Sequence, residues 1–107
     1  MEFIDVASVG EIPDNGMLSV SLPSGEQVCL IRRGYDVSAL RDECPHQGMA
    51  LSAGEILPDG AIECAWHGAR FDCRTGAVVR GPAESDAVLV QVRVDNGRVL
   101  VADRPLR

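Results

Sequence analysis

Alternation of apolar and polar positions is the dominant pattern along this chain, and it predicts short β-strands separated by turns. Residues 17–22 alternate as a half-buried strand does, and residues 23–26 (PSGE) after them predict a turn. Residues 27–33 form an apolar run with β-branched side chains that ends at Gly34. Residues 37–41 predict the next strand, so this half of the chain reads as a series of neighbouring strands.

The clearest predicted hairpin lies at the C-terminal end. Residues 87–95 place valines at alternate positions, and the Asn-Gly dipeptide at 96–97 is a strong signal for a type I′ turn. A two-residue turn fixes three facing pairs: Asp95 with Arg98, Val94 with Val99, and Val92 with Val101. We therefore expect valine to meet valine on the buried face and opposite charges to meet at the exposed end.

The middle of the chain also lacks helical signals. Residues 54–56 and 61–63 predict a hairpin around the turn at 57–60 (LPDG), and residues 74–76 (RTG) predict a further turn. Residues 81–83 (GPA) predict a loop with a restricted backbone. No stretch combines helical periodicity with caps, and there is no internal repeat. The predicted fold class is all-β, a small sandwich or barrel, with one domain over residues 1–107.

The net charge limits the kinds of partner that the chain is expected to bind. The formal net charge is −6, with 16 acidic residues against 10 basic ones, all of them arginine. An acidic surface argues against nucleic acid and against an anionic membrane, and it favours a protein partner with basic docking residues. The chain has no apolar run near about 18 residues and starts with acidic residues, where a signal peptide needs basic ones. We therefore expect a cytoplasmic protein.

The candidate chemistry lies in two short motifs, CPHQG at 44–48 and CAWHG at 64–68. They contain both histidines of the chain, and each motif pairs one Cys with one His on a loop after a predicted strand. The hairpin around residues 57–60 connects the two loops and is expected to bring them together. This pattern has three interpretations. The residues are unrelated buried cysteines and hydrogen-bonded histidines, or they bind a single zinc ion, or they bind a [2Fe–2S] cluster.

The spacing favours the cluster over zinc. Zinc fingers pair Cys with Cys and His with His along the chain, whereas each loop here supplies one of each. A Rieske centre has two Cys on one iron and two His on the other. The predicted metal ligands are accordingly Cys44 and Cys64 on the inner iron, and His46 and His67 on the outer iron. Gly48 and Gly68 allow the backbone to pass close to the cluster and to present N–H groups to its sulfides.

The two motifs, the following ARFD, the RTG turn and the GPA loop together resemble the Rieske-type ferredoxins, the small electron carriers of bacterial ring-hydroxylating dioxygenase systems. The resemblance extends over nearly the whole chain. It implies a β-sandwich-like fold with one [2Fe–2S] cluster at one tip, held by two ligand loops and covered by a third loop, which corresponds to residues 81–83. It also implies a flavoprotein reductase that supplies electrons and a terminal oxygenase that receives them.

Four positions suggest which kind of Rieske protein this is. Some relatives tie the ligand loops together by a disulfide, but Met49 and Trp66 stand at the corresponding positions. High-potential relatives have a Ser and a Tyr whose hydroxyls donate hydrogen bonds to the cluster, and Ala69 and Phe71 stand there instead. Because donors stabilise the added electron, their absence predicts a reduction potential near the bottom of the Rieske range, about −150 mV.

The resemblance also implies which residues surround the cluster: Pro45, Gly48, Met49, Trp66, Gly68, Ala69, Phe71 and Pro82. Partner proteins are expected to dock on Gln47, Ala65 and Trp66 around the two histidines. Trp66 has a second interpretation, in which it packs the two loops together. Cys29 and Cys73 are predicted to be structural, and a shuttle between two partners is expected to be a monomer.

Two features of the sequence argue against function classes other than an electron carrier. A catalytic oxygenase needs a further iron held by two His and a carboxylate, and the cluster uses both histidines. The chain has no glycine-rich dinucleotide fingerprint. We therefore expect an electron-transfer component and no enzyme. A small Rieske-like subunit of a reductase, such as assimilatory nitrite reductase, and a zinc-stabilised interaction module remain the two alternatives.

Overall fold

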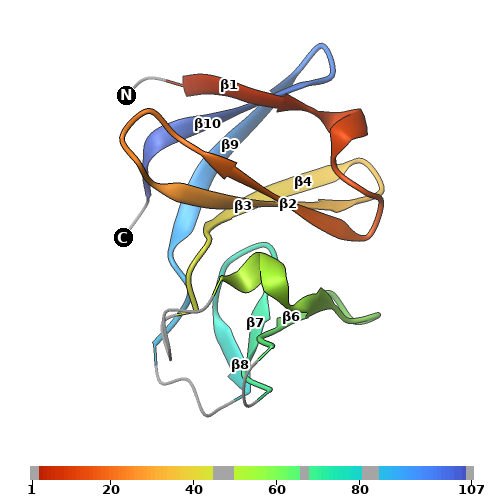
Figure 1. Cartoon of the computed structure of the whole chain (residues 1–107). Coiled ribbons are helices and arrows are strands. Elements are labelled where there is room, and N and C mark those ends of the chain that lie inside the picture. The colour runs from red at the N-terminus through yellow and green to blue at the C-terminus, as the bar shows by residue number, and fades with distance from the viewer. Residues whose placement is uncertain (1–2, 45–49, 66–67, 81–84, 106–107) are drawn as a thin grey trace.

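The computed structural model describes residues 3–44, 50–65, 68–80 and 85–105 of the 107-residue chain (Figure 1). These residues form strands and two short 3₁₀ turns and contain no α-helix, which confirms the predicted all-β class. No helix in this part of the chain is long and apolar enough to cross a membrane. The elements in chain order are β1 (Phe3–Ser8), η1 (Val9–Glu11), β2 (Gly16–Ser21), β3 (Gln27–Arg33), β4 (Asp36–Arg41), η2 (Leu51–Ala53), β5 (Glu55–Ile56), β6 (Ala61–Glu63), β7 (Arg70–Asp72), β8 (Val78–Arg80), β9 (Leu89–Asp95) and β10 (Arg98–Pro105).

Two antiparallel sheets make up the fold. The larger sheet has six strands in the order β1-β10-β9-β4-β3-β2, and the smaller has four in the order β5-β6-β7-β8. Figure 1 shows the smaller sheet below the larger one, with both ends of the chain on the larger sheet. All four strands of the smaller sheet lie between β4 and β9 in the sequence. The smaller sheet is therefore a single insertion into the larger one.

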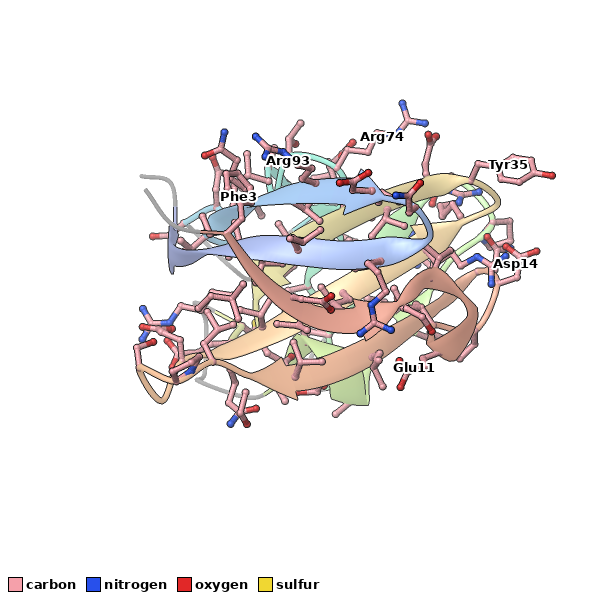
Figure 2. All side chains as sticks on the ribbon, turned by 90° about the horizontal axis from the view of Figure 1, so that it is seen from above. Phe3, Glu11, Asp14, Tyr35, Arg74 and Arg93 are labelled. Atoms are coloured by element: carbon pink, nitrogen blue, oxygen red, sulfur yellow. The ribbon has the colours of Figure 1, made fainter. Side chains whose placement is uncertain are left out.

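Strand β3 separates two hydrophobic cores. Its residues Val28 to Ile31 are all buried, so the run is continuous rather than alternating. Cys29 and Ile31 belong to the core between the two sheets, whereas Val28 and Leu30 belong to the core that the larger sheet encloses. Figure 2 shows how the larger sheet curves round on itself. Successive side chains of a strand point to opposite faces, so a strand with a core on each side needs apolar residues throughout.

The register predicted for the C-terminal hairpin is confirmed. Val94 faces Val99 and Val92 faces Val101, and Asn96 and Gly97 have the positive φ values, 50° and 76°, that the tight turn needs. The expectation that valines on both strands are buried is wrong for Val94, which is 45% exposed, while Val99 is fully buried. Strand β9 pairs with β4 only at Leu89 and Val90, so its other end has β10 as its one paired strand among the described residues and is left at the surface.

The facing charges predicted for the same hairpin are also confirmed, because Asp95 lies opposite Arg98. The guanidinium of Arg98, however, binds both carboxylate oxygens of Asp5 on β1, at 2.7 and 3.0 Å. This pair holds β1 to β10, and the hydrogen bonds from Arg98 lower the pKa of Asp5. Strand β1 was not predicted, because its partner strand lies at the far end of the sequence and its residues do not alternate.

Candidate metal centre

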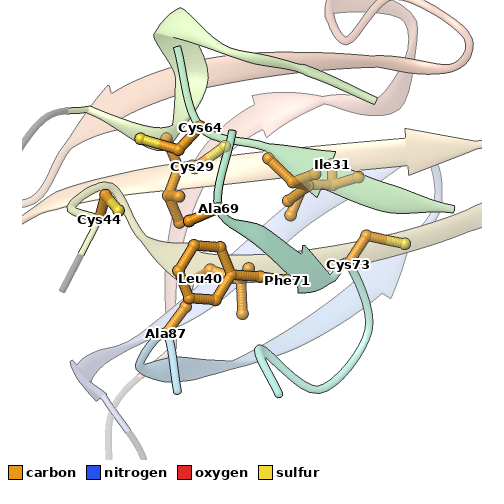
Figure 3. Packing of buried hydrophobic residues seen from close by; sticks show 11 residues of the cluster. Cys29, Ile31, Leu40, Cys44, Cys64, Ala69, Phe71, Cys73 and Ala87 are labelled. Carbon is orange, nitrogen blue, oxygen red and sulfur yellow. The ribbon is translucent and has the colours of Figure 1, made fainter. Parts of the chain in front are cut away.

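Both predicted thiol ligands are buried in the same hydrophobic core. Cys44 follows the end of β4 and Cys64 follows the end of β6, and they are 0% and 2% exposed. Figure 3 shows them on one side of the core, with the ring of Phe71 and the methyl group of Ala69 also in this core. The two thiols therefore come from separate loops, one after each sheet, into one apolar environment at the boundary between the sheets.

The second candidate loop is closed across its base by backbone and side-chain contacts. The Cys64 amide donates to the Ala69 carbonyl at 2.8 Å, and Glu63 and Arg70, which face each other on β6 and β7, form an ion pair at 3.0 Å. Gly68 has φ +70°, a conformation that residues with a Cβ rarely adopt. The loop is thus a tight connection whose first residue, Cys64, is fixed by the sheet beneath it.

The first candidate loop is joined across its base by the side chain of Asp42. This carboxylate accepts hydrogen bonds from the amide and the hydroxyl of Ser52, at 2.8 and 2.7 Å, and from the hydroxyl of Ser19 at 2.6 Å. Asp42 is only 8% exposed, and it is the one buried polar or charged residue among those that the structure describes. Ser52 lies in η2, so the carboxylate connects the residues before and after the loop with β2.

The short hairpin of β5 and β6 joins the two loops, as the sequence predicted. Ile56 faces Ile62, and Glu55 faces Glu63 directly before Cys64. At the start of this hairpin Gly54 lies so close to Glu63 that an added Cβ would overlap with the Glu63 carbonyl oxygen. The end of the first loop and the start of the second are therefore packed backbone against backbone.

The structure locates some of the residues predicted to surround the centre. Ala69 and Phe71 are fully buried in the core that contains Cys44 and Cys64, while Ala65 is exposed on the second loop. Neither of the two buried side chains has a hydrogen-bond donor. The remaining predicted residues lie outside the described residues: Pro45, His46, Gln47, Gly48, Met49, Trp66, His67 and Pro82. Their roles stay predictions.

The described donors fit an iron–sulfur cluster as far as they go. Two buried thiols in an apolar core suit a thiophilic metal, because a thiolate there needs a cation to compensate its charge. Within the described ranges no group of three or more His, Cys, Asp or Glu side chains is placed to hold a metal ion. These two thiols are the cysteine half of the predicted Cys2His2 set, whose histidine half lies outside the described residues, and the set itself stays a prediction.

The other two cysteines lie in the same core. Cys29 is fully buried in β3, and burial raises the pKa of its thiol far above the ordinary value, with the Asp42 carboxylate acting in the same direction. Burial also raises the pKa of the Cys73 thiol, and Asp72 adds to that. Cys73 lies at the opposite side of the core from Cys44 in Figure 3. No disulfide is present at any of the four cysteines, all of which are described. The raised pKa values favour the protonated thiols of Cys29 and Cys73, which agrees with the predicted structural role.

Sequence reasoning missed the residues that hold the loops. Asp42 lies in the segment RDEC, where it resembles an ordinary surface turn residue, and its partners Ser19 and Ser52 are 23 and 10 residues away. Gly54 resembles any glycine at a turn. The only signal in the sequence was their position, two residues before and six residues after the first motif.

The similarities to known proteins cover the whole site. The model of the family described as the Rieske [2Fe-2S] domain matches residues 2–100. The biphenyl dioxygenase ferredoxin subunit of Pseudomonas sp. strain KKS102 is 31% identical over 101 residues, which are 94% of this chain and 92% of that protein.

Solved structures agree with this match. The ferredoxin of carbazole 1,9a-dioxygenase from Nocardioides aromaticivorans IC177 has a TM-score of 0.90 and 28% identity, over 97% of this chain and 100% of that one. A ferredoxin-like match with a TM-score of 0.89 and 26% identity, over 98% and 96% of the two chains, comes from the complex of reduced oxygenase and oxidised ferredoxin in carbazole 1,9a-dioxygenase.

Proposed function

The chain belongs to the Rieske [2Fe–2S] domain family, and from this premise we propose that it carries single electrons from a flavoprotein reductase to a terminal ring-hydroxylating oxygenase. The observation that carries the proposal is the pair of buried thiols, Cys44 and Cys64, which come from two separate loops into one core. The similarity to a ferredoxin solved together with its oxygenase supports the choice of partner.

The chain holds one [2Fe–2S] cluster. We propose Cys44 and Cys64 as the ligands of the inner iron and His46 and His67 as those of the outer iron. When bound, the cluster supplies a one-electron couple. The protein's part is to hold it at one tip of the fold, where the ligand loops end and a partner can approach the histidines. Gln47, Ala65 and Trp66 are the proposed docking residues around them, and Ala65 is exposed as docking requires.

The described residues around the thiols support the proposal of a low reduction potential. Ala69 and Phe71 offer the cluster no side-chain donor, and Asp42 adds a buried negative charge two residues before Cys44. Reduction adds a negative charge, so both features disfavour the reduced state. A potential near the bottom of the Rieske range, about −150 mV, follows from them. Such a carrier is reducible by a flavin or a nicotinamide-linked donor and does not suit oxidation of a quinol.

This role is that of an electron-transfer component, as in the similar ferredoxin components, and not that of the catalyst. Neither of the alternatives, a subunit of nitrite reductase or a zinc-stabilised module, is favoured by these similarities. We propose that residues 1–107 form one domain that acts as a monomer in the cytoplasm. A small free body is suited to exchange between two partners.

The test is a redox titration of anaerobically purified protein, followed by electron paramagnetic resonance and by iron and sulfide content. We expect two iron and two sulfide per chain and a Rieske-type signal on one-electron reduction, with a midpoint low in the range. The variants Cys44→Ala and His46→Ala should abolish that signal, and Cys73→Ala, which removes a thiol on the other side of the core, should leave it intact. A colourless protein that retains zinc would contradict the proposal.

A further inference from the structure

The two candidate cluster loops are closed in different ways. The second has a backbone hydrogen bond from Cys64 to Ala69 and an ion pair between β6 and β7 across its base. In the first, the side chain of Asp42 connects described residues on the two sides. We propose that Asp42 is the positioning residue of the first cluster loop, and that it ties the strand end before the loop to Ser52 after it. This inference rests on the proposed function.

The contacts of Asp42 account for both of its oxygens. Oδ1 accepts from the Ser52 amide at 2.8 Å, and Oδ2 accepts from the hydroxyls of Ser52 and Ser19 at 2.7 and 2.6 Å. Burial of a carboxylate is costly unless donors surround it. Three donors from two other segments meet this one, and hydrogen bonds to a charged acceptor are the stronger kind. An aspartate in an exposed surface turn would not need three donors from other parts of the chain.

The hydrogen bonds of Asp42 lie close to Cys44, a proposed cluster ligand. Asp42 is two residues before Cys44, and its own amide donates to the Gln27 carbonyl at 2.9 Å, which fixes the backbone to the start of β3. Next to Ser52, the fully buried Leu51 packs in the same core as Cys44. Movement of Ser52 away from Asp42 would therefore release both the loop and the apolar contact beneath it.

The third partner connects the loop with the larger sheet. Ser19 lies on β2, an edge strand of that sheet, and η2 packs against the same strand. The carboxylate thus lies between β2, the end of β4 and η2. A ligand loop held in this way keeps its first cysteine in one position whether or not the cluster is reduced, and a fixed ligand geometry lowers the reorganisation that accompanies transfer.

Two substitutions distinguish the positioning role of Asp42 from an effect of its negative charge. Asp42→Ala removes every acceptor, whereas Asp42→Asn keeps one oxygen for the Ser52 amide and offers an NH2 group to the serine hydroxyls, which can also accept. We expect Asp42→Ala to speed hydrogen exchange of the Ser52 amide by about tenfold, the factor for loss of one such hydrogen bond. It should also speed cluster loss and broaden the resonance signal. Asp42→Asn should largely restore all three.

Asp36→Ala is the matched control. Asp36 carries the same charge on the same strand as the residues before the loop, but it pairs with Arg74 on the surface. It should leave exchange at Ser52 and cluster retention unchanged. If Asp42→Ala fails to fold, Ser52→Ala and Ser19→Ala remove one donor each and should accelerate cluster loss in the same direction.

Two results would overturn the inference. One is normal exchange at Ser52 together with normal cluster retention in Asp42→Ala. The other is Asp42→Asn behaving like Asp42→Ala, which would assign the effect to charge alone. The exchange measurement is made on cluster-free as well as loaded protein. If the unaltered protein contains no cluster, the proposed function is wrong. The exchange measurement on cluster-free protein still tests whether Asp42 holds Ser52.

Discussion

The backbone at Gly54 lies against the carbonyl group of Glu63, so closely that a side chain at position 54 would overlap with the carbonyl oxygen. Gly54 ends the segment that follows the first ligand loop, and Glu63 directly precedes Cys64 in the second. The absence of a side chain at one residue thereby sets how near the two loops come to each other.

Gly54→Ala should therefore destabilise the protein and weaken cluster binding. The overlap involves backbone on both sides and cannot be relieved by a rotamer change, so we expect a loss of at least about 1–3 kcal/mol in the free energy of unfolding. Urea unfolding and the rate of cluster loss measure the effect. Gly10→Ala is the control, because a Cβ there meets nothing within 4 Å. Equal behaviour of the two variants would disprove the contact.

Ala69→Ser should raise the reduction potential. A hydroxyl beside the cluster would donate a hydrogen bond that strengthens on reduction by about 0.5–1.5 kcal/mol, which corresponds to roughly 20–60 mV for one electron. A redox titration measures it. Ala61→Ser places the same hydroxyl at another buried alanine, on β6, and should leave the potential unchanged. An unshifted midpoint in Ala69→Ser would mean that this position does not lie beside a sulfide.

His67→Cys should lower the potential, provided that a cluster assembles. A thiolate would add negative charge where a neutral imidazole stood, and the reduced state would become less favourable. The redox titration and the resonance spectrum report the change. Ala65→Cys adds a thiol to the same loop at an exposed position and should leave both unaltered. A higher potential in His67→Cys would contradict the assignment of His67 as a ligand.

Acid should weaken the contact between β1 and β10. Arg98 lowers the pKa of Asp5, so the pair contributes stability above the unfolded-state pKa near about 3.9 and loses it as pH falls through the lower folded value. Asp5→Asn should be less stable than the unaltered protein at neutral pH, and the difference should shrink as pH falls below about 4. Urea midpoints across pH test this. Parallel curves would refute it, and Asp95→Asn on the neighbouring strand is the control.

Much of the fold followed from local patterns in the sequence. The Asn-Gly turn fixed the register of β9 and β10, and β3 was identified over the same residues that form it. Local reasoning failed where distant segments decide the outcome. Val94 is partly exposed where β9 extends beyond its short pairing with β4, and Arg98 binds Asp5 from the other end of the chain. Strands β7 and β8 have only three residues each and offer no periodicity to detect.

The candidate site divides in the same way. Ligand types are visible in the sequence because metals demand particular donors at particular spacings, and the burial of Cys44 and Cys64 agrees with that prediction. The supports of the ligands are not visible. Asp42 and Gly54 act through residues that come near only after the chain has folded, so neither shows any local pattern. The histidine ligands and the docking residues, Ala65 included, remain predictions from the motifs.

The way in which the smaller sheet is inserted into the larger one bears on how related chains can exchange segments. Its chain leaves the larger sheet at the end of β4 and returns at the start of β9, and these strands are neighbours, with the Arg41 amide bonded to the Val88 carbonyl at 2.8 Å. Entry and exit therefore lie side by side, as at the neck of a domain insertion. We expect the inserted segment to be exchangeable as a unit between two such chains: a swap must match one pair of adjacent strand ends and the core shared with Cys29, Ile31 and Leu40, and it leaves the six-stranded frame continuous.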